Sequence, residues 1–151
     1  MAKRKLTSFA AVEEALKELE KAKTARLPGS WTVAQMLAHC AQSIDYSLDG
    51  YPTARSALFR STVGPLALKR FISKGEMSHD LEAAIPGAPE PVDGSLQEGV
   101  ARLRDAISRF QSHKGEVAHH FAYGKVAREA YEKVHAMHIA NHLSAVELSP
   151  T

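Results

Sequence analysis

The sequence predicts an all-α protein, a four-helix bundle with short accessory helices and a long loop rich in proline and glycine. Three observations predict this class. Apolar residues recur at helical spacings of three and four, turn residues separate these segments, and no segment alternates apolar and polar residues over several strands. The chain has 151 residues, of which 44% are apolar and 24% charged. This length and composition suit one globular domain, so we expect residues 1–151 to form a single helical bundle domain.

The first two helices are each predicted by one apolar stripe with turn residues behind it. The first is expected over residues 8–25 and ends before residues 27–29, which read Leu-Pro-Gly. The second is expected over residues 31–48, with Ser30 as its N-cap and the turn sequence of residues 49–52 after it. The stripes consist of Phe9, Val12, Leu16 and Leu19 in the first helix and of Val33, Leu37, Cys40 and Ile44 in the second.

A third helical region is expected within residues 54–74, where Gly64-Pro65 begins a helix that Gly75 ends. Residues 76–94 contain three prolines and two glycines within nine positions, which predicts a long loop that either shapes a binding site or only connects helices.

The fourth and the last helices have clearer boundaries. Ser95 followed by Glu98 is a capping-box pattern, and the fourth helix is expected from there to Gln111. The last helix is expected over residues 126–148, with a stripe of Ala127, Tyr131, Val134, Ala145 and Leu148.

Charge and composition exclude several classes of function. The formal net charge is +2, and no basic stripe with interleaved aromatic residues is present, so we expect no nucleic-acid partner. No apolar run reaches the roughly 18 residues needed to span a bilayer. No apolar segment follows the charged N-terminus, so we expect neither a membrane anchor nor a secretory signal. The single cysteine, Cys40, excludes an internal disulfide and suits a cytoplasmic protein.

Three histidines, His135, His138 and His142, fall within eight residues of the last helix. Residues four apart in a helix are separated by about 40° around the axis and about 6 Å along it, so His138 and His142 can reach one cation. His39 of the second helix can face them across the bundle. Three histidines with an open fourth position are typical of catalytic zinc sites. An exposed histidine face, or buried imidazoles bonded to side chains or water, would produce the same spacing.

Other polar residues have possible roles around such a site. Gln35, Asp45 and Asn141 are candidates to accept the second N–H of a ligating imidazole. His135 is a further pocket residue, or a fourth ligand if the last helix is rotated. Glu132 precedes His135 by three residues, but no second copy of this pair exists, which argues against a di-iron site.

The remaining histidines and the cysteine are weaker candidates. We set His79 and His113 aside because they are expected in a loop and at a helix end, and we leave His119 and His120 open. Cys40 falls on the apolar stripe of its helix and is expected to pack as a small apolar residue rather than to act as a nucleophile.

Several motifs in order resemble one protein superfamily. Residues 31–39 read Trp-Thr-x-x-Gln-x-Leu-x-His, and His138 and His142 close the chain as His-x-x-x-His. Between them lie a Gly-Tyr-Pro turn at residues 50–52, a Pro-Gly-Ala-Pro loop at residues 86–89 and a turn similar to His-x-Phe-Gly before the last helix. Over residues 27–148 the chain resembles an uncharacterised branch of the DinB-like superfamily. It departs from that branch in a longer turn at residues 120–124, and in Asn141 where the branch often has histidine.

This resemblance implies a DinB-like four-helix bundle with a metal site of three histidines, here His39, His138 and His142, that holds zinc or nickel. It also implies a homodimer. Some members of the superfamily are S-transferases that use bacillithiol, mycothiol or glutathione-like thiols, and others are hydrolases or isomerases. The first hypothesis is therefore a metal-dependent S-transferase or hydrolase, in which the cation activates a thiol or water against a small electrophile. The alternatives are a non-catalytic bundle that binds a metal or small ligand in a regulatory or interaction role, and an interaction protein without an ion.

Overall fold

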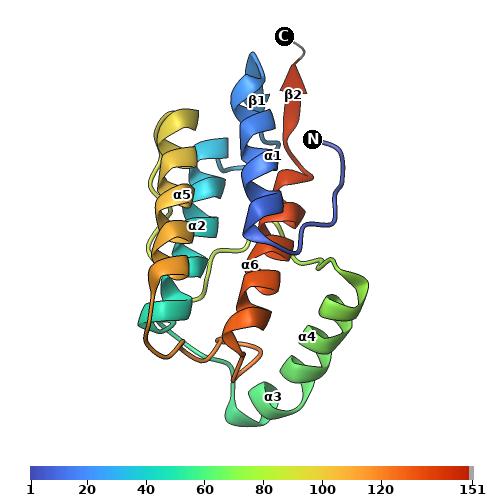
Figure 1. Ribbon diagram of the computed structural model, residues 1–151, viewed down its shortest axis with the longest axis vertical. Coiled ribbons are helices and arrows are strands. Elements are labelled where there is room, and N and C mark those ends of the chain that lie inside the picture. Colours follow the sequence, from blue (N-terminus) through green and yellow to red (C-terminus); the bar gives the residue numbers. More distant parts are fainter. Residues whose placement is uncertain (150–151) are drawn as a thin grey trace.

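The computed structural model describes residues 1–149, and these residues are mostly helical (Figure 1). In chain order, the elements are α1 (Phe9–Lys21), β1 (Thr24–Arg26), α2 (Val33–Asp49), α3 (Ala57–Ser61), α4 (Val63–Lys74), α5 (Leu96–Ser112), α6 (Arg128–Leu143) and β2 (Glu147–Ser149). The prediction of a helical protein is confirmed. The small antiparallel sheet of β1 and β2 was not expected from the sequence.

The four longest helices, α1, α2, α5 and α6, run side by side, and α3 and α4 lie at the lower right of Figure 1. The pair α2 and α5 is in especially close contact. A Cβ added at Gly99 of α5 would lie 2.9 Å from the Cα of Ala34 in α2, so the missing side chain permits this approach. Helix α6 contacts α1, α2 and α4 and buries residues on several sides. Side chains of α6 therefore project into the interior of the protein.

The two strands change the expected ends of the first and last helices. Helix α1 ends at Lys21 instead of extending to about residue 25, and α6 ends at Leu143 instead of Leu148. The released segments pair with each other, with Ala25 opposite Leu148. This pairing joins segments far apart in the sequence, and each strand is too short to give an alternating pattern.

The N-cap of α2 also differs from the prediction. Thr32, not Ser30, caps the helix: its Oγ1 accepts a hydrogen bond from the Gln35 backbone N–H, and Oε1 of Gln35 accepts one from the Thr32 backbone N–H, both at 3.1 Å. This reciprocal capping box satisfies two backbone donors and outweighs the single cap that Ser30 could offer. The predicted capping box of Ser95 and Glu98 is present at the start of α5.

The segment between α4 and α5 is a long loop, as expected, and side chains from α2 and the segment after it bind its backbone. These side chains donate hydrogen bonds to main-chain oxygens of proline residues. The three bonds run from Gln35 to Pro91 at 3.3 Å, from Gln42 to Pro89 at 3.1 Å and from Thr53 to Pro86 at 3.1 Å. The second half of the loop is therefore fixed against α2.

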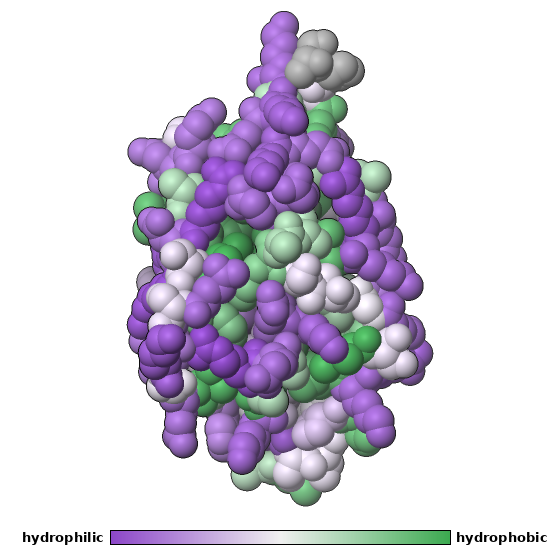
Figure 2. Space-filling view, in the orientation of Figure 1, coloured by the Kyte–Doolittle hydropathy of each residue, from purple (hydrophilic) through white to green (hydrophobic). Residues whose placement is uncertain are grey.

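The surface is mixed in polarity. Figure 2 shows a hydrophilic upper part on the face turned to the viewer and more apolar surface in the lower half. The large apolar side chains that are exposed include Leu58, Val63 and Leu66 of α3 and α4. Among the described residues, none of the helices has both the length and the apolar character needed to cross a bilayer.

His135 lies in the hydrophobic core and not in a pocket. Its ring stacks on Tyr131 with centroids 5.4 Å apart and packs edge-on against Phe110 at 5.5 Å. Its Nε2 lies 2.9 Å from Oγ of Ser47, which itself donates to the carbonyl oxygen of Ile44. Since the Ser47 proton is committed to Ile44, His135 donates from Nε2 and is an uncharged imidazole.

We predict that His135 makes the fold sensitive to acid. Burial, with a smaller contribution from nearby His120, lowers the pKa of His135 to about 3, whereas an unfolded histidine has a pKa of about 6.5. Between these values the unfolded state binds a proton that the folded state does not, so stability is full above about pH 6.5 and falls as the pH drops towards 3. Lowering the pH from 7 to 5 should cost about 2 kcal/mol through this residue.

Urea unfolding of the metal-free protein at several pH values measures this slope. His135→Gln should reduce the loss of stability between pH 7 and pH 5 by about 2 kcal/mol, whatever its stability at pH 7. His119→Gln, at an exposed position, is the matched control and should keep the wild-type slope. Equal slopes in the two variants would contradict the assignment.

Candidate metal centre

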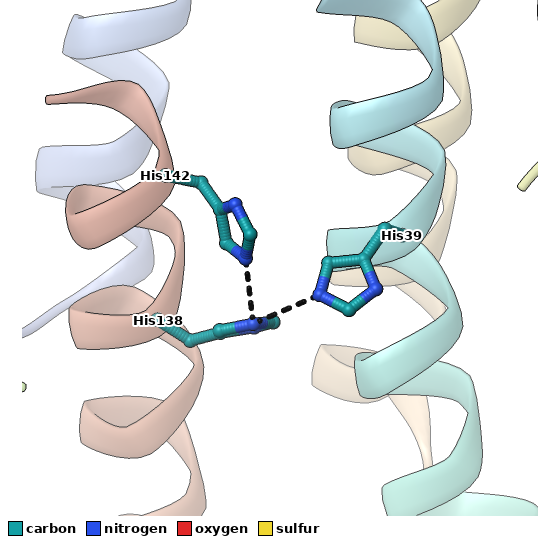
Figure 3. Close-up of side chains that lie close together, drawn as sticks. All are labelled: His39, His138 and His142. Carbon is teal, nitrogen blue, oxygen red and sulfur yellow. Dashed lines mark hydrogen bonds between the residues drawn. The ribbon is translucent and has the colours of Figure 1, made fainter. Parts of the chain in front are cut away.

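Three histidines from two helices point toward one another in the interior of the protein (Figure 3). His39 projects from α2, and His138 and His142 project from α6. The Nε2 atom of His138 lies 3.2 Å from Nε2 of His39 and 3.1 Å from Nε2 of His142. One donor atom from each ring lies within 4.8 Å of the others. The structure therefore brings together the three residues selected from the sequence, and these three can hold a metal ion.

The three ring nitrogens cannot satisfy one another with hydrogen bonds alone. An imidazole nitrogen carries either one proton or one lone pair, so it makes one good hydrogen bond. Nε2 of His138 has two nitrogen neighbours at hydrogen-bond distance, which leaves one contact between two like groups. A cation removes this conflict because it accepts all the lone pairs. Zinc–nitrogen bonds of about 2.0–2.1 Å place tetrahedral ligand atoms about 3.3 Å apart. The two separations from Nε2 of His138, 3.2 and 3.1 Å, are close to this value.

Burial keeps these imidazoles uncharged. His39 and His142 are 2% and 1% exposed, and His138 is half-buried. Burial lowers the pKa of His39 to about 4, with repulsion from a charged His79 as a smaller cause. Burial lowers the pKa of His142 to about 2 and that of His138 well below its ordinary value, and repulsion from neighbouring histidines adds to both shifts. Neutral rings have the lone pairs that metal coordination requires.

Packing, rather than a polar partner, orients His39. The Trp31 ring lies 4.9 Å from the His39 ring, and Nε1 of Trp31 donates to the Glu90 carboxylate at 3.1 Å. Nδ1 of His39 is buried and has no hydrogen-bond partner within residues 1–149. The motif Trp-Thr at the start of α2 thus has two local roles: the threonine caps the helix and the tryptophan covers the histidine.

The three residues expected to accept the second N–H of a ligating imidazole have other partners in the structure. Gln35 caps α2, and Asp45 binds Arg102 and Arg109 on α5. Asn141 does approach the site, but its Nδ2 lies 2.9 Å from Nδ1 of a different histidine, His79. Within the described chain, none of the three candidates is hydrogen-bonded to His39, His138 or His142.

The position of His79 corrects the sequence analysis, which set this residue aside because it lies in a loop. Its Nε2 is 3.3 Å from Nε2 of His142, and its ring centroid is 4.9 Å from that of His138. The loop folds back over the open side of the three histidines. A loop residue has no helical periodicity, so the spacing of the sequence gave no signal for it.

The other histidines considered from the sequence have partners or positions away from the three converging rings, and the cysteine is unsuited to act as a nucleophile. His135 is bound to Ser47 in the core and is neither a pocket residue nor a fourth ligand. His113 caps α5 and contacts the backbone of its own turn, and His119 is exposed. Cys40 is fully buried, and burial raises the pKa of its thiol, which opposes a nucleophilic role as expected.

A cavity of about 370 Å³ opens beside His39, His79 and His138. Its walls are largely apolar. They come from α2, α4, the loop, the turn before α6 and α6 itself, and the apolar side chains include Phe71, Met77, Ile85, Phe121, Tyr123 and Val134. The polar groups on the walls include the carboxylate of Asp80, whose Oδ1 accepts a hydrogen bond from the Glu82 backbone. A small, mostly apolar molecule can therefore lie next to His39 and His138.

His120 forms part of the cavity wall and fixes the turn before α6. Its Nδ1 accepts hydrogen bonds from the backbone N–H groups of Ala122 and Tyr123, at 3.1 and 3.2 Å. The backbones of His120 and Gly124 also bond to each other in both directions. Because Nδ1 is an acceptor, the proton of the neutral ring sits on Nε2. Burial lowers the pKa of His120 to about 3, so the ring is an uncharged hydrogen-bond donor.

We predict that the protein as purified binds about one equivalent of a transition metal, as expected for one set of three imidazole ligands. His39→Ala and His138→Ala should each lose it, because two imidazoles make a weak site. ICP-MS on untagged protein, purified without added metal, measures the content. His119→Ala, which removes an exposed histidine, should keep the wild-type content. Equal metal content in all four proteins would place the metal elsewhere.

Comparison with known proteins gives one result. Residues 1–149 match the model of a family described as a protein of unknown function, DUF1569. No curated protein matches the chain, and no solved structure matches it. The match covers nearly the whole chain, including every histidine of the candidate centre. The chain belongs to the DUF1569 family.

Proposed function

We propose that the protein is a metal-dependent enzyme of the DinB-like type, an S-transferase or hydrolase that acts on a small electrophile. The observation that carries this proposal is the convergence of three neutral imidazoles, two of which, His39 and His138, line an apolar cavity of about 370 Å³. The arrangement of α1, α2, α5 and α6 supports a DinB-like four-helix bundle, with the ligands on α2 and α6. We further propose zinc or nickel as the ion, and a cytoplasmic homodimer as the working form.

The residues of the site have separate tasks in this proposal. A divalent cation held by His39, His138 and His142 would lower the pKa of a bound thiol or water and so supply a nucleophile near neutral pH. Low solvent access around His39 and His142 strengthens the interaction between charges there. The carboxylate of Asp80 on the cavity wall can pass the released proton to solvent.

The cavity favours a compact substrate with an apolar body and one polar group. Apolar side chains hold the body, and the uncharged Nε2–H of His120 offers a hydrogen bond to an oxygen of the substrate. In the transfer reaction the thiol sulfur bonds to the electrophilic carbon, and the leaving group departs with the electron pair of its bond. The thiol proton goes to Asp80 or water. A low-molecular-weight thiol of the bacillithiol, mycothiol or glutathione type is the proposed co-substrate.

A second candidate function is a metal- or ligand-binding protein without catalysis, in a regulatory or interaction role. His79 favours it, because its Nε2 lies 3.3 Å from Nε2 of His142, and a fourth imidazole bound to the same ion would leave no open position. The two functions make different predictions for turnover once the metal is bound.

We predict that the metal-loaded protein transfers a thiol to a small aromatic halide faster than the metal-free protein does, with ester hydrolysis as the comparison reaction. Ala84→Trp should fill the cavity from an exposed loop position and raise KM about tenfold or more, the effect of losing about 1.4 kcal/mol of substrate binding. Its metal content should stay at the wild-type level.

Ala54→Trp, at an exposed position outside the cavity, is the matched control and should leave KM unchanged. Turnover that is insensitive to Ala84→Trp would show that the cavity is not the substrate site. A stoichiometric metal with neither transfer nor hydrolysis would favour the non-catalytic candidate.

A further inference from the structure

We propose that His79 is a fourth, exchangeable ligand of the metal centre, delivered by the loop between α4 and α5. This inference rests on the proposed metal centre at His39, His138 and His142. Nε2 of His79 lies 3.3 Å from Nε2 of His142, which matches the edge of a tetrahedral zinc site of about 3.3 Å. Its ring centroid is 4.9 Å from that of His138 and 5.1 Å from that of His142.

The ring nitrogens of the four histidines, His79 included, cannot all be satisfied by hydrogen bonds to one another. Four Nε2 atoms form a chain of three close contacts, in the order His39, His138, His142 and His79. Each nitrogen makes one good hydrogen bond, so four nitrogens can satisfy two of the three contacts at most. A shared cation would satisfy all four once the loop brings His79 closer, since the ligand atoms that lie within 4.8 Å of one another are those of His39, His138 and His142. The position of His79 therefore has the same explanation as that of the first three.

Asn141 positions His79. Its side-chain amide lies 2.9 Å from Nδ1 of His79, on the side of the ring opposite the cluster. The amide nitrogen Nδ2 faces Nδ1 in the structure. When Nε2 of His79 binds a cation, Nδ1 carries a proton, and the Asn141 amide turned by 180° presents its oxygen to accept a hydrogen bond from Nδ1–H. This is the usual support for a ligating imidazole, in which the second ring nitrogen has its own partner.

The short segment that carries His79 has few hydrogen bonds to the rest of the protein. Within residues 1–149, the hydrogen bonds from residues 78–81 to other elements of the structure are those of His79 with Asn141 and His142. The segment is mainly exposed, and its neighbours Met77 and Ile85 are buried and anchor it on both sides. His79 is therefore the one of the four rings that an incoming ligand can replace.

This arrangement gives the centre two states. In the resting state His79 would hold the fourth position beside His39, His138 and His142. A thiol, water or other small ligand that enters from the cavity would take the place of His79, which would retain its bond to Asn141. Such an exchange would explain why a fourth histidine lies at the centre although a cavity suited to a substrate opens beside it.

Cobalt(II)-substituted protein tests the proposal through its visible absorption spectrum, together with zinc affinity measured by chelator competition. His79→Ala should still bind one equivalent of metal, with an affinity about 10- to 100-fold lower, the range typical of losing one supporting group at a metal site. Its cobalt spectrum should change, and added imidazole should restore the wild-type spectrum. Small anions such as azide should bind the variant more tightly than the wild type, because they need not displace His79.

Ser78→Ala, in the same exposed segment, controls for loop disturbance and should keep wild-type affinity and spectrum. Asn141→Ala should weaken zinc binding less than His79→Ala does. If His79→Ala has the zinc affinity and cobalt spectrum of the wild type, His79 is not a ligand and the centre of three histidines stands. If the wild type binds neither zinc nor cobalt, the metal centre itself is refuted and the inference falls with it.

Discussion

The interior of this protein contains imidazole rings that cannot all be paired with one another. Helix α6 is surrounded by α1, α2 and α4, so histidines on more than one side of it are withdrawn from water. A buried polar group without a partner costs free energy. His135 meets this constraint with a hydrogen bond to Ser47, whereas His138 and His142 converge with His39. One turn of α6 thus separates a structural histidine from a candidate metal ligand.

The site lies between α2 and α6, and neighbouring elements pack closely around these two helices. Gly99 brings α5 close to α2, and Trp31 covers His39 from the helix N-terminus. Gly64 of α4 has the same effect near the turn before α6, because a Cβ there would lie 1.9 Å from the carbonyl oxygen of Ala122. One part of the cavity wall, at Ala122, is therefore backed by a close backbone approach of α4.

The sequence predicts the parts of this structure that depend on local spacing. The pair His138 and His142 follows from helical geometry, and the capping box at Ser95 follows from its motif. His39 could be added because the second helix has a clear apolar stripe beside it. The resemblance to a known superfamily selected the same three residues independently of geometry.

Features that depend on contacts distant in sequence were missed. The strand pair joins segments about 120 residues apart, and Asp45 is held by arginines of α5 rather than by a ligand. His79 reaches the site through a loop with no periodicity, so no spacing rule places it. Asn141 was selected as a partner for a ligating histidine, and the histidine that it contacts is this unpredicted one.

The hydrogen bonds between α2 and the backbone of the proline-rich loop affect which residues can vary among members of the family. Three of the hydrogen bonds that hold the loop go to main-chain oxygens, those of Pro86, Pro89 and Pro91, while the side chains of Glu90 and Asp93 accept two more. The side chains of Ala83 and Ala84, which line the cavity, can change while these bonds persist. The cavity wall can therefore acquire a new shape and polarity by single substitutions, without loss of the scaffold that positions it. Divergence of substrate preference among relatives would then be concentrated in this loop, while the helices that carry the imidazoles vary slowly.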